Sequence, residues 1–571
     1  MPKEIKYIQP INPTDEDRHN MLKIALEKAN HIEDFNNIVE LLSPPKDITT
    51  IASPISCKGL KVGIIGGGLA GLSSAFELRK LGFDITIFEM QEKRIGGRVY
   101  THYFDKDKRF YGELGAMRIP ISHETTWHYI NLFDLKTRPF IQTNENAFIY
   151  VRNKRAKNDS EGKSVMEKIY PDFNLTSWEK NTPWPELIDY ALGSNLLKIS
   201  PDIRKELLQI KKQYSTPIKY FGNLSIREVL EKMGLSEGAI ELISSVSPFL
   251  GSFYYNSYFE SLQEDYSVDS AYRYEIIDGA VNLPLSFYNS LMSKRPKEYY
   301  NIEKEDVGKV SWENGQTVTS IFKENNKISL EYTNENSSKT SHQTFDFVIC
   351  TIPFSSLRNV SVYPMFSTEK MQAIKEVNYT ASQKTIFMCN ERFWEKGDDK
   401  IIGGGSFTDL PITSIWYPND NIRVNTNHME NKKISNKNKK YNLNDDAGVL
   451  LASYNLNQDA IRLGNLDDKT RIEEIKRQVE AVHDLPNGYL DSIVKDFRTV
   501  EWNNEKGSLG AFCYFMPNQQ NLFSYAMIKP EYNNSVYFAG EHTSLTHGWM
   551  QGAVNSGMKV ANAIAKYCES M

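Results

Sequence analysis

Residues 61–71 read Lys61-Val62-Gly63-Ile64-Ile65-Gly66-Gly67-Gly68-Leu69-Ala70-Gly71, and they contain the strongest structural signal in the chain. A short apolar run ends directly in glycines with the spacing GxGxxG, at Gly66, Gly68 and Gly71. The first glycine permits a tight turn, the second lets the backbone approach a pyrophosphate, and the third allows a helix to pack closely on the strand. Ala70 lies in the first turn of the expected helix, where unpaired N–H groups face the phosphates.

A second strand signal follows this glycine loop. Residues 84–88 end at Glu89, eighteen residues after Gly71. A carboxylate at that position accepts hydrogen bonds from the hydroxyl groups of a ribose. An acid rather than an arginine there argues against a 2′-phosphate, and hence against NADP. The segment therefore predicts a β-α-β unit that binds a dinucleotide.

Two further segments carry glycines beside charged residues. In Arg94-Ile95-Gly96-Gly97-Arg98, the backbone at Gly97 can pass close to a diphosphate while the guanidinium of Arg98 pairs with it. Near the C-terminus, residues 535–542 read as a strand that enters a turn at Gly540 and Glu541. Both segments suit a cofactor with a diphosphate.

The three segments occur in the same order in the flavin-containing amine-oxidase superfamily, which this chain resembles over nearly its whole length. The resemblance implies a bound FAD, with Glu541 at its ribityl–phosphate region. It also implies a closing helix under the isoalloxazine, and residues 554–564 supply an apolar face for such a helix. Trp502 matches a tryptophan that is frequent in this superfamily, with core packing as the alternative.

The dinucleotide signals lie near residues 60, 275 and 540, which indicates a discontinuous domain. A chain of 571 residues is also too long for one ordinary core. We therefore expect an α/β protein with a discontinuous Rossmann-like FAD-binding domain, a mixed-sheet substrate domain and an inserted helical domain. The expected boundaries are 55–110, 271–376 and 530–571 for the first, 1–54, 111–152 and 377–529 for the second, and 153–270 for the third.

The segment Gly112-Glu113-Leu114-Gly115-Ala116-Met117-Arg118-Ile119-Pro120 narrows the family. It resembles the G-x-M-R-[LI]-P segment of L-amino-acid oxidases, in which the arginine binds the α-carboxylate of the substrate. The resemblance makes Arg118 the carboxylate ligand and Met117 a neighbour of the flavin. A planar guanidinium suits this role because it meets a carboxylate through two parallel hydrogen bonds.

The same resemblance supplies four more residues of the expected substrate site. Tyr454 stands where the family has a tyrosine as second carboxylate ligand, and Leu456 then faces the substrate side chain. Gly548 offers its carbonyl to the substrate ammonium, and Trp549 forms one aromatic wall beside the flavin. For Tyr454 and Trp549, ordinary core packing is the alternative reading.

Three positions bear on the flavin itself. Lys384, in an apolar strand, resembles the lysine that holds a water at flavin N5, with surface exposure as the alternative. Phe512 resembles the residue of the opposite aromatic wall and is expected to face Trp549, with core packing as the alternative. Ala511 stands where members with covalent flavin have a cysteine, so the FAD is expected to be non-covalent.

The implied reaction is oxidative deamination of an L-amino acid by O₂, giving a 2-oxo acid, ammonia and H₂O₂. Three alternatives stay open: an amide-forming amino-acid 2-monooxygenase, an amine or polyamine oxidase, and a flavoprotein without activity. The preferred side chain does not follow from the sequence. Arg273 and Arg227 suit an acidic substrate, but surface charge is the more common role of an arginine.

Composition narrows the partners and the compartment. The net charge is −5, and basic residues do not cluster, which argues against nucleic acid. Residues 1–20 contain no signal peptide and no run of about 18 apolar residues occurs, so we expect a cytoplasmic protein without a membrane partner. Five scattered cysteines predict neither a disulfide framework nor a metal site. Residues 421–446 read as a solvated insertion, and the family resemblance suggests a homodimer or higher oligomer.

Overall fold

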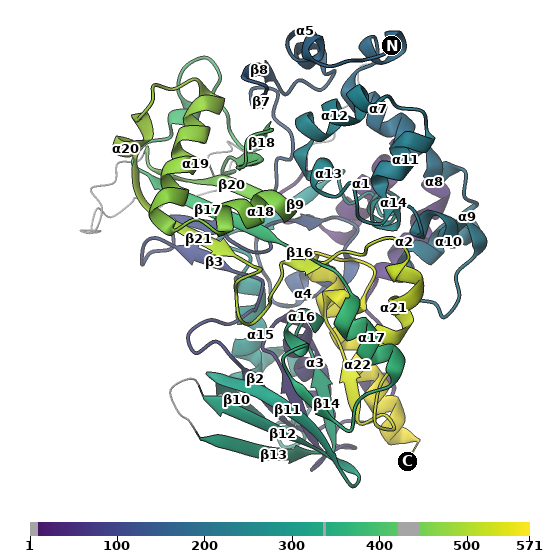
Figure 1. The fold of residues 1–571 in the computed structure, drawn as a ribbon. Coiled ribbons are helices and arrows are strands. Elements are labelled where there is room, and N and C mark those ends of the chain that lie inside the picture. Colours follow the sequence, from purple (N-terminus) through teal and green to yellow (C-terminus); the bar gives the residue numbers. More distant parts are fainter. Residues whose placement is uncertain (1–8, 335–338, 421–445, 571) are drawn as a thin grey trace.

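The computed structural model describes residues 9–334, 339–420 and 446–570. Figure 1 shows a region of parallel strands at one end of the molecule, a seven-stranded sheet beside it and a group of helices next to that sheet. The predicted insertion 421–446 lies outside the described residues except for Asp446. The fold is mixed α/β with several sheets, as the sequence predicts.

The parallel sheet contains strands from distant parts of the chain. Its order is β10-β2-β1-β14-β23, and each neighbouring pair is parallel. The strands are β1 Lys61–Ile65, β2 Asp84–Glu89, β10 Val310–Asn314, β14 Phe347–Cys350 and β23 Val536–Phe538. The inner strands are continuous apolar runs because helices and a second sheet cover both faces. The predicted β-α-β unit is present in this sheet.

Two helices cross closely over the glycine loop. Helix α3 Leu69–Arg79 is buried along its whole length, and α22 Met550–Glu569 packs against it. A Cβ atom at Gly557 would collide with Ser73 Oγ, and Ser74 Oγ donates a hydrogen bond to the Gly557 carbonyl at 3.2 Å. The apolar face predicted for residues 554–564 is therefore the face that covers α3.

A four-stranded sheet, ordered β13-β12-β11-β15, packs beside the parallel sheet. Its strands are β11 Gln316–Glu324, β12 Lys327–Asn334, β13 Thr340–Phe345 and β15 Ser361–Tyr363. At its junction with the parallel sheet, β13 ends at Phe345 and β14 begins at Phe347. Asp346 separates them and accepts a hydrogen bond from the Lys61 amide at 2.8 Å, which turns the chain from one sheet into the other.

The seven-stranded mixed sheet has the order β21-β17-β20-β19-β18-β7-β8. Its strands are β7 Phe148–Val151, β8 Lys154–Lys157, β17 Ser382–Cys389, β18 Gly405–Thr408, β19 Ser414–Trp416, β20 Gly448–Leu456 and β21 Val494–Glu501. Helices α18 Asn457–Gly464 and α19 Asp468–His483 pack against it. Residues 154–157, expected to belong to the helical segment, instead form β8, because they pair antiparallel with β7.

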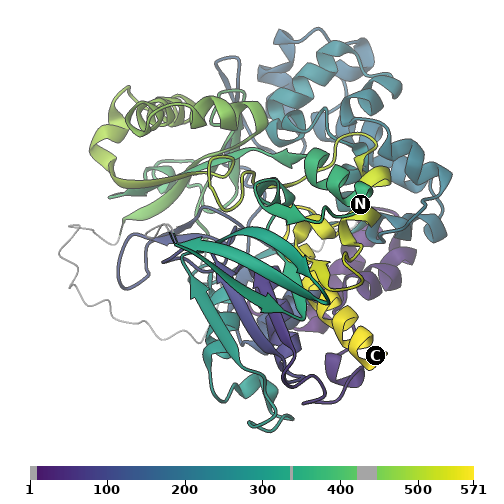
Figure 2. The same cartoon turned by 60° about the horizontal axis from the view of Figure 1, so that its bottom comes forward.

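The helical segment lies on the other side of the molecule from α19 (Figure 2). Its helices are α5 Lys163–Lys168, α6 Ser177–Lys180, α7 Trp184–Ile188, α8 Ser194–Leu197, α9 Pro201–Arg204, α10 Thr216–Gly222, α11 Ile226–Lys232, α12 Glu237–Val246, α13 Pro248–Ser252 and α14 Tyr258–Tyr266. The chain leaves this segment into β9 Arg273–Ile276, the central strand of a three-stranded sheet with β5 Ile119–Pro120 and β6 Thr137–Pro139.

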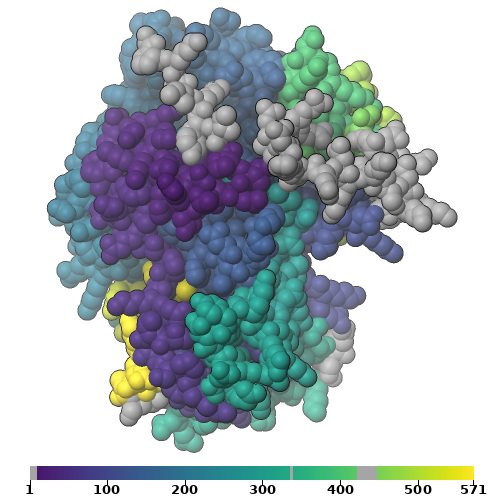
Figure 3. All heavy atoms as spheres, turned by 180° about the vertical axis from the view of Figure 1, so that it is seen from behind, coloured from purple at the N-terminus to yellow at the C-terminus, as the bar shows by residue number. Residues whose placement is uncertain are grey.

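The N-terminal residues form α1 Asp15–Lys28 and α2 Phe35–Leu42, which lie on the back surface of the molecule (Figure 3). Arg18 on α1 forms an ion pair with Glu124 on α4 Glu124–Leu132, with a nitrogen–oxygen distance of 2.8 Å. The remaining elements include β3 Thr101–Tyr103, β4 Tyr111–Glu113, α15 Asn282–Met292, α16 Phe354–Leu357, α17 Thr368–Glu376, β16 Tyr379–Thr380, α20 Tyr489–Ile493, β22 Phe512–Cys513 and α21 Gln519–Ile528. Among the described helices, none has the length and apolar character needed to cross a bilayer.

Candidate active site

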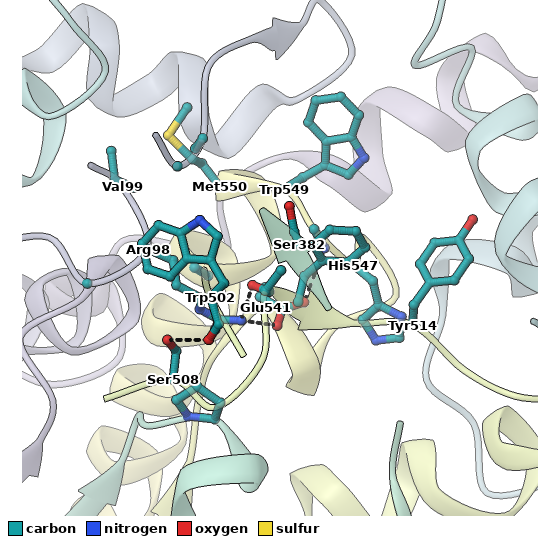
Figure 4. Close-up of a pocket in the computed structure, with 18 of the residues that line it drawn as sticks. Arg98, Val99, Ser382, Trp502, Ser508, Tyr514, Glu541, His547, Trp549 and Met550 are labelled. Carbon is teal, nitrogen blue, oxygen red and sulfur yellow. Dashed lines mark hydrogen bonds and ion pairs between the residues drawn. The ribbon is translucent and has the colours of Figure 1, made fainter. Parts of the chain in front are cut away.

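One cavity of about 940 Å³ lies where the parallel sheet, the seven-stranded sheet and the helical segment meet. Its wall contains every residue that the sequence analysis assigns to the cofactor or the substrate, except Gly71. Figure 4 shows Arg98, Glu541, His547 and Trp549 around this pocket. The cavity is large enough for a cofactor and a small substrate together.

The glycine loop forms one end of the cavity. Gly66 has a φ of 108°, a conformation that favours glycine, and its amide donates to the Phe88 carbonyl at 2.8 Å. A Cβ atom at Gly68 would meet no atom within 4 Å, so the backbone there borders open space. Gly71 faces inward instead, because a Cβ atom would collide with the Gly66 carbonyl. The loop thus leaves a backbone-lined hollow at the N-terminus of α3, which fits a diphosphate.

Glu89 sits at the end of β2 beside this hollow. Its carboxylate accepts hydrogen bonds from the amides of Gly67 and Gln91, both at 2.8 Å. Burial raises its pKa above the ordinary value. The side chain is held by the loop and also lines the cavity, which is the position the sequence assigns to the ribose ligand.

An ion pair joins the early and late cofactor segments. Arg98 Nη1 lies 2.8 Å from Glu541 Oε1 and also donates to the Ala511 carbonyl at 3.0 Å. Glu541 accepts further hydrogen bonds from the amides of Cys513 and Gly548. Burial raises the pKa of Glu541, but the charges of Arg98 and two histidines together with a backbone hydrogen bond outweigh it, and the pKa is lowered. Three distant parts of the chain, at Arg98, Cys513 and residues 541–548, therefore meet at one carboxylate.

Lys384 lies on β17 and is only 3% exposed, so it is not a surface lysine. Its ammonium donates to the Gly115 carbonyl at 2.7 Å and lies 4.3 Å from the centre of the Tyr454 ring. These two residues meet because Lys384 pairs with Tyr454 in the register of β17 and β20. Burial lowers the pKa of Lys384 to about 7, against an opposing effect of Glu113.

Arg118 lies in the wall of the same cavity, close to Tyr454. Its Nη1 donates to Gln142 Oε1 at 3.3 Å, and its guanidinium lies 5.0 Å from the centre of the Trp416 ring. Burial lowers the pKa of Arg118. No carboxylate among the described residues lies within ion-pair distance of it, so this cation faces the cavity without an acidic partner.

The segment before α22 forms another wall. Gly548 has a φ of 75°, and the Phe512 ring packs against its α-carbon, 3.3 Å from where a Cβ atom would lie. Phe512 and Trp549, predicted as opposite aromatic walls, both line the cavity. The Phe512 ring packs on Phe253 and Tyr514, whereas the indole of Trp549 has other neighbours.

Those neighbours of Trp549 are His123, whose ring centre is 5.2 Å away, and the guanidinium of Arg273, also at 5.2 Å from the indole centre. Both aromatic rings therefore border the cavity, and each is held by different neighbours. The indole of Trp549 thus lies beside Arg273, an arginine that the sequence alone suggests to be a surface charge.

Arg273 is buried in the cavity wall, so the surface interpretation is wrong for this residue. Burial, together with the charge of Arg118, lowers the pKa of Arg273 to about 9. Arg227, in contrast, forms ion pairs with Glu231 and Glu237 on the outside of the helical segment. Only the pairing of β9 with β5 distinguishes the two arginines, and that pairing is not visible in the sequence.

Comparison with known proteins agrees with this geometry. An L-amino-acid oxidase of Crotalus adamanteus is 29% identical over 557 residues, which is 95% of this chain and 93% of that protein. An L-amino-acid oxidase of Bothrops atrox is 28% identical over 547 residues, 95% of each chain.

Among solved structures, a putrescine oxidase matches with a TM-score of 0.62 at 15% identity, over 88% of this chain and 98% of that one. A cyclohexylamine oxidase from Brevibacterium oxydans matches with a TM-score of 0.61 at 16% identity, over 89% and 99%. These two likenesses establish the fold. Residues 69–565 match the model of a family whose members contain flavin. The chain belongs to the flavin-containing amine oxidoreductase family and is an enzyme with a flavin cofactor.

Proposed function

We propose that this enzyme is an FAD-dependent L-amino-acid oxidase, which converts an L-amino acid, O₂ and water into a 2-oxo acid, ammonia and H₂O₂. The observation that carries the proposal is Arg118, a partly buried cation without an acidic partner in the described part of the chain, in the same cavity as the glycine loop. A substrate carboxylate supplies that partner. A simple amine does not, so Arg118 argues against an amine oxidase.

FAD fits the cavity along the glycine loop. Gly66, Gly68 and Ala70 would surround its diphosphate, and Glu89 would accept hydrogen bonds from its ribose. Gly97, Arg98, Met117, Trp502, Gly540 and Glu541 would complete the remaining contacts. The chemistry that FAD supplies when bound is acceptance of a hydride from the substrate and transfer of the electrons to O₂.

Non-covalent binding is supported by the residues near the flavin end of the cavity. Ala511 has no side-chain nucleophile. The nearby Cys513 is fully buried and is absent from the cavity wall, and burial raises the pKa of its thiol to about 11. A neutral buried thiol is a poor nucleophile.

The chain's own residues position the substrate. Arg118 and the hydroxyl of Tyr454 would bind the α-carboxylate, and the Gly548 carbonyl would accept a hydrogen bond from the amine. Glu541 fixes the Gly548 backbone by accepting its N–H at 3.1 Å. Leu456 and Trp549 line the space beside the side chain. Holding both the carboxylate and the amine in this way orients the Cα–H bond. Such orientation is a large source of rate acceleration.

Lys384 would act on water and oxygen. Its ammonium is anchored on the Gly115 carbonyl, and a pKa of about 7 lets it exist in both protonation states near neutral pH. The protonated form would stabilise negative charge that develops on O₂. The neutral form would accept a hydrogen bond from the water that hydrolyses the imino acid.

Product analysis tests the proposal. Purified enzyme is incubated with single L-amino acids in air, and 2-oxo acid, ammonia and H₂O₂ are measured beside amide and CO₂. Equal amounts of 2-oxo acid and H₂O₂ are expected. Amide and CO₂ as main products would show a 2-monooxygenase, and oxidation of amines alone would show an amine oxidase.

A further inference from the structure

Arg273 has bonding capacity that the fold does not use. It is 6% exposed, and its Nε donates to the Asp269 carbonyl at 2.6 Å while the guanidinium lies over the Trp549 ring. Within the described residues, no hydrogen bond or ion pair engages its two terminal nitrogens. Since Arg273 lines the cavity, these donors border the space that the substrate enters.

Arg273 and Arg118 approach each other beside the small sheet. Strands β5 and β9 are antiparallel, and Pro120 pairs with Arg273. Arg118 lies two residues before Pro120, just outside β5, so this pairing brings it near Arg273. Both line the cavity, and the charge of Arg118 contributes to the lowered pKa of Arg273.

Two neighbouring cations, of which Arg273 is buried and Arg118 partly buried, are costly unless acceptors reach them. Arg118 has the α-carboxylate as its partner in the proposed reaction. Arg273 therefore requires a second hydrogen-bond acceptor on the same ligand, at a different position from the α-carboxylate. A simple apolar side chain does not supply one.

Two neighbouring acidic residues of α14, Asp265 and Glu264, line the cavity, and the charge of Glu264 acts on both Arg118 and Arg273. Burial raises the pKa of Glu264 to about 7. Among the described residues no ion pair joins Glu264 to Arg273, and both side chains line the cavity. A side chain with a terminal oxygen fits there, since the oxygen accepts from Arg273. A carboxamide additionally offers an N–H₂ group to Glu264.

We propose that Arg273 is a specificity-determining residue and that the preferred substrates are L-amino acids whose side chains end in a carboxyl or carboxamide oxygen. The proposal rests on the proposed function, because it assigns the α-carboxylate to Arg118. It adds the side-chain end of the substrate, with Arg273 as the donor and Trp549 as the surface below it.

The test compares substrates and variants. Steady-state kcat/KM is measured for L-glutamate, L-glutamine, L-aspartate and L-asparagine beside L-leucine and L-norleucine. The variants are Arg273→Met, which keeps most of the apolar volume, and Arg273→Lys, which keeps the charge. Arg227→Met is the matched control on an exposed arginine.

We expect the wild type to prefer the oxygen-bearing side chains. Arg273→Met should lose roughly 10- to 150-fold in kcat/KM for them, as expected for a lost hydrogen bond to a charged group. The same variant should change kcat/KM for L-leucine less than threefold. For the oxygen-bearing substrates, kcat/KM of Arg273→Lys should lie between the values of the wild type and Arg273→Met. L-glutamate against L-glutamine decides whether the acceptor is a carboxylate or a carboxamide.

A binding experiment makes the result independent of turnover. Inhibition constants of 2-oxoglutarate and 4-methyl-2-oxopentanoate are measured against the best substrate, and only the first should weaken in Arg273→Met. The role of Arg273 would be overturned if the wild type prefers L-leucine and Arg273→Met leaves the ratio of kcat/KM for L-glutamate to kcat/KM for L-leucine unchanged. The oxidase function would stand in that case. Reaction with no L-amino acid at all would overturn the proposed function itself.

Discussion

His547 Nδ1 lies 2.9 Å from Glu260 Oε1, and both side chains are only 1% exposed. Glu260 belongs to α14 of the helical segment, whereas His547 directly precedes Gly548 and Trp549 in the cavity wall. The same Glu260 oxygen accepts the Phe515 amide at 2.7 Å. One buried carboxylate therefore fixes the loop that carries the proposed ammonium ligand.

Removing this carboxylate should destabilise the enzyme. We expect Glu260→Ala to lower the free energy of unfolding by about 3–5 kcal/mol, because it leaves a buried imidazolium without its carboxylate partner. Urea unfolding of the holoenzyme measures this. Glu237→Ala, at an exposed glutamate of α12, is the control and should stay within about 0.5 kcal/mol of the wild type.

The effect of Glu260→Ala should depend on pH. Burial alone would lower the pKa of His547, but Cys513 and Glu260 outweigh it and raise the pKa well above 6.5. A raised folded-state pKa contributes stability that is complete below 6.5 and is lost as pH rises through the folded-state value. The difference between wild type and variant should thus shrink at high pH, and a difference that grows would contradict the ion pair.

Two glycines of the same loop should respond differently to alanine. At Gly68 an added methyl group meets open space within the cavity, so Gly68→Ala should fold but retain little flavin. At Gly71 the methyl group would collide with the Gly66 carbonyl, so Gly71→Ala should lower the melting temperature of the apoprotein itself. Flavin absorbance and thermal unfolding separate the two effects. Full flavin content in Gly68→Ala would exclude a diphosphate from that hollow.

Substitution of Arg118 tests the carboxylate site. We expect Arg118→Ala to reduce kcat/KM for every L-amino acid by roughly thirtyfold to several thousandfold. This corresponds to a loss of about 2–5 kcal/mol of transition-state binding energy. Most of the change should appear in KM. Arg118→Lys keeps the charge but loses the paired donors, so it should lie between. An unchanged KM in Arg118→Ala would show that Arg118 does not bind the α-carboxylate of the substrate.

Lys384 should make the oxygen reaction depend on pH. Because its pKa is lowered to about 7, the ammonium is mostly protonated at pH 6 and mostly neutral at pH 8. The rate at which pre-reduced enzyme consumes O₂ should fall across this range. Lys384→Met should be slower by about 10²-fold and show no such fall. A wild-type rate that rises from pH 6 to 8 would contradict the proposed role.

The same lysine provides a stability readout. Its folded-state pKa of about 7 lies below the ordinary value of 10.5, so the unfolded chain binds more protons between these values. This residue therefore makes stability increase as pH rises from 7 to 10.5. Lys384→Met should lose that increase, which is visible as a flatter dependence of melting temperature on pH.

The features that the sequence predicted well are local ones. The turn at Gly66 to Gly71 follows from residues that are neighbours in the chain, and so does the strand–helix–strand order around it. Family resemblance adds single positions such as Lys384 and Tyr454, which the structure brings into contact through strand register. These positions needed no knowledge of long-range packing.

The features that were missed depend on long-range pairing. Arg273 enters the cavity because β9 pairs with β5, more than 150 residues earlier in the chain. The ion pair of Arg98 with Glu541 spans 443 residues, and His547 meets Glu260 across 287. Neither partner of such a pair carries a local sign of the other. In the sequence, Arg273 therefore looks like a surface charge, because the residues that surround it lie far away in the chain.

The central claim is that Arg118 and its surroundings select amino acids rather than amines. The most direct measurement is the absorbance of the enzyme-bound flavin under anaerobic conditions, titrated with twenty L-amino acids and several amines, putrescine among them. The account predicts loss of the flavin absorbance with certain L-amino acids and none with the amines. Loss with amines only would contradict it, and so would a spectrum that no compound changes.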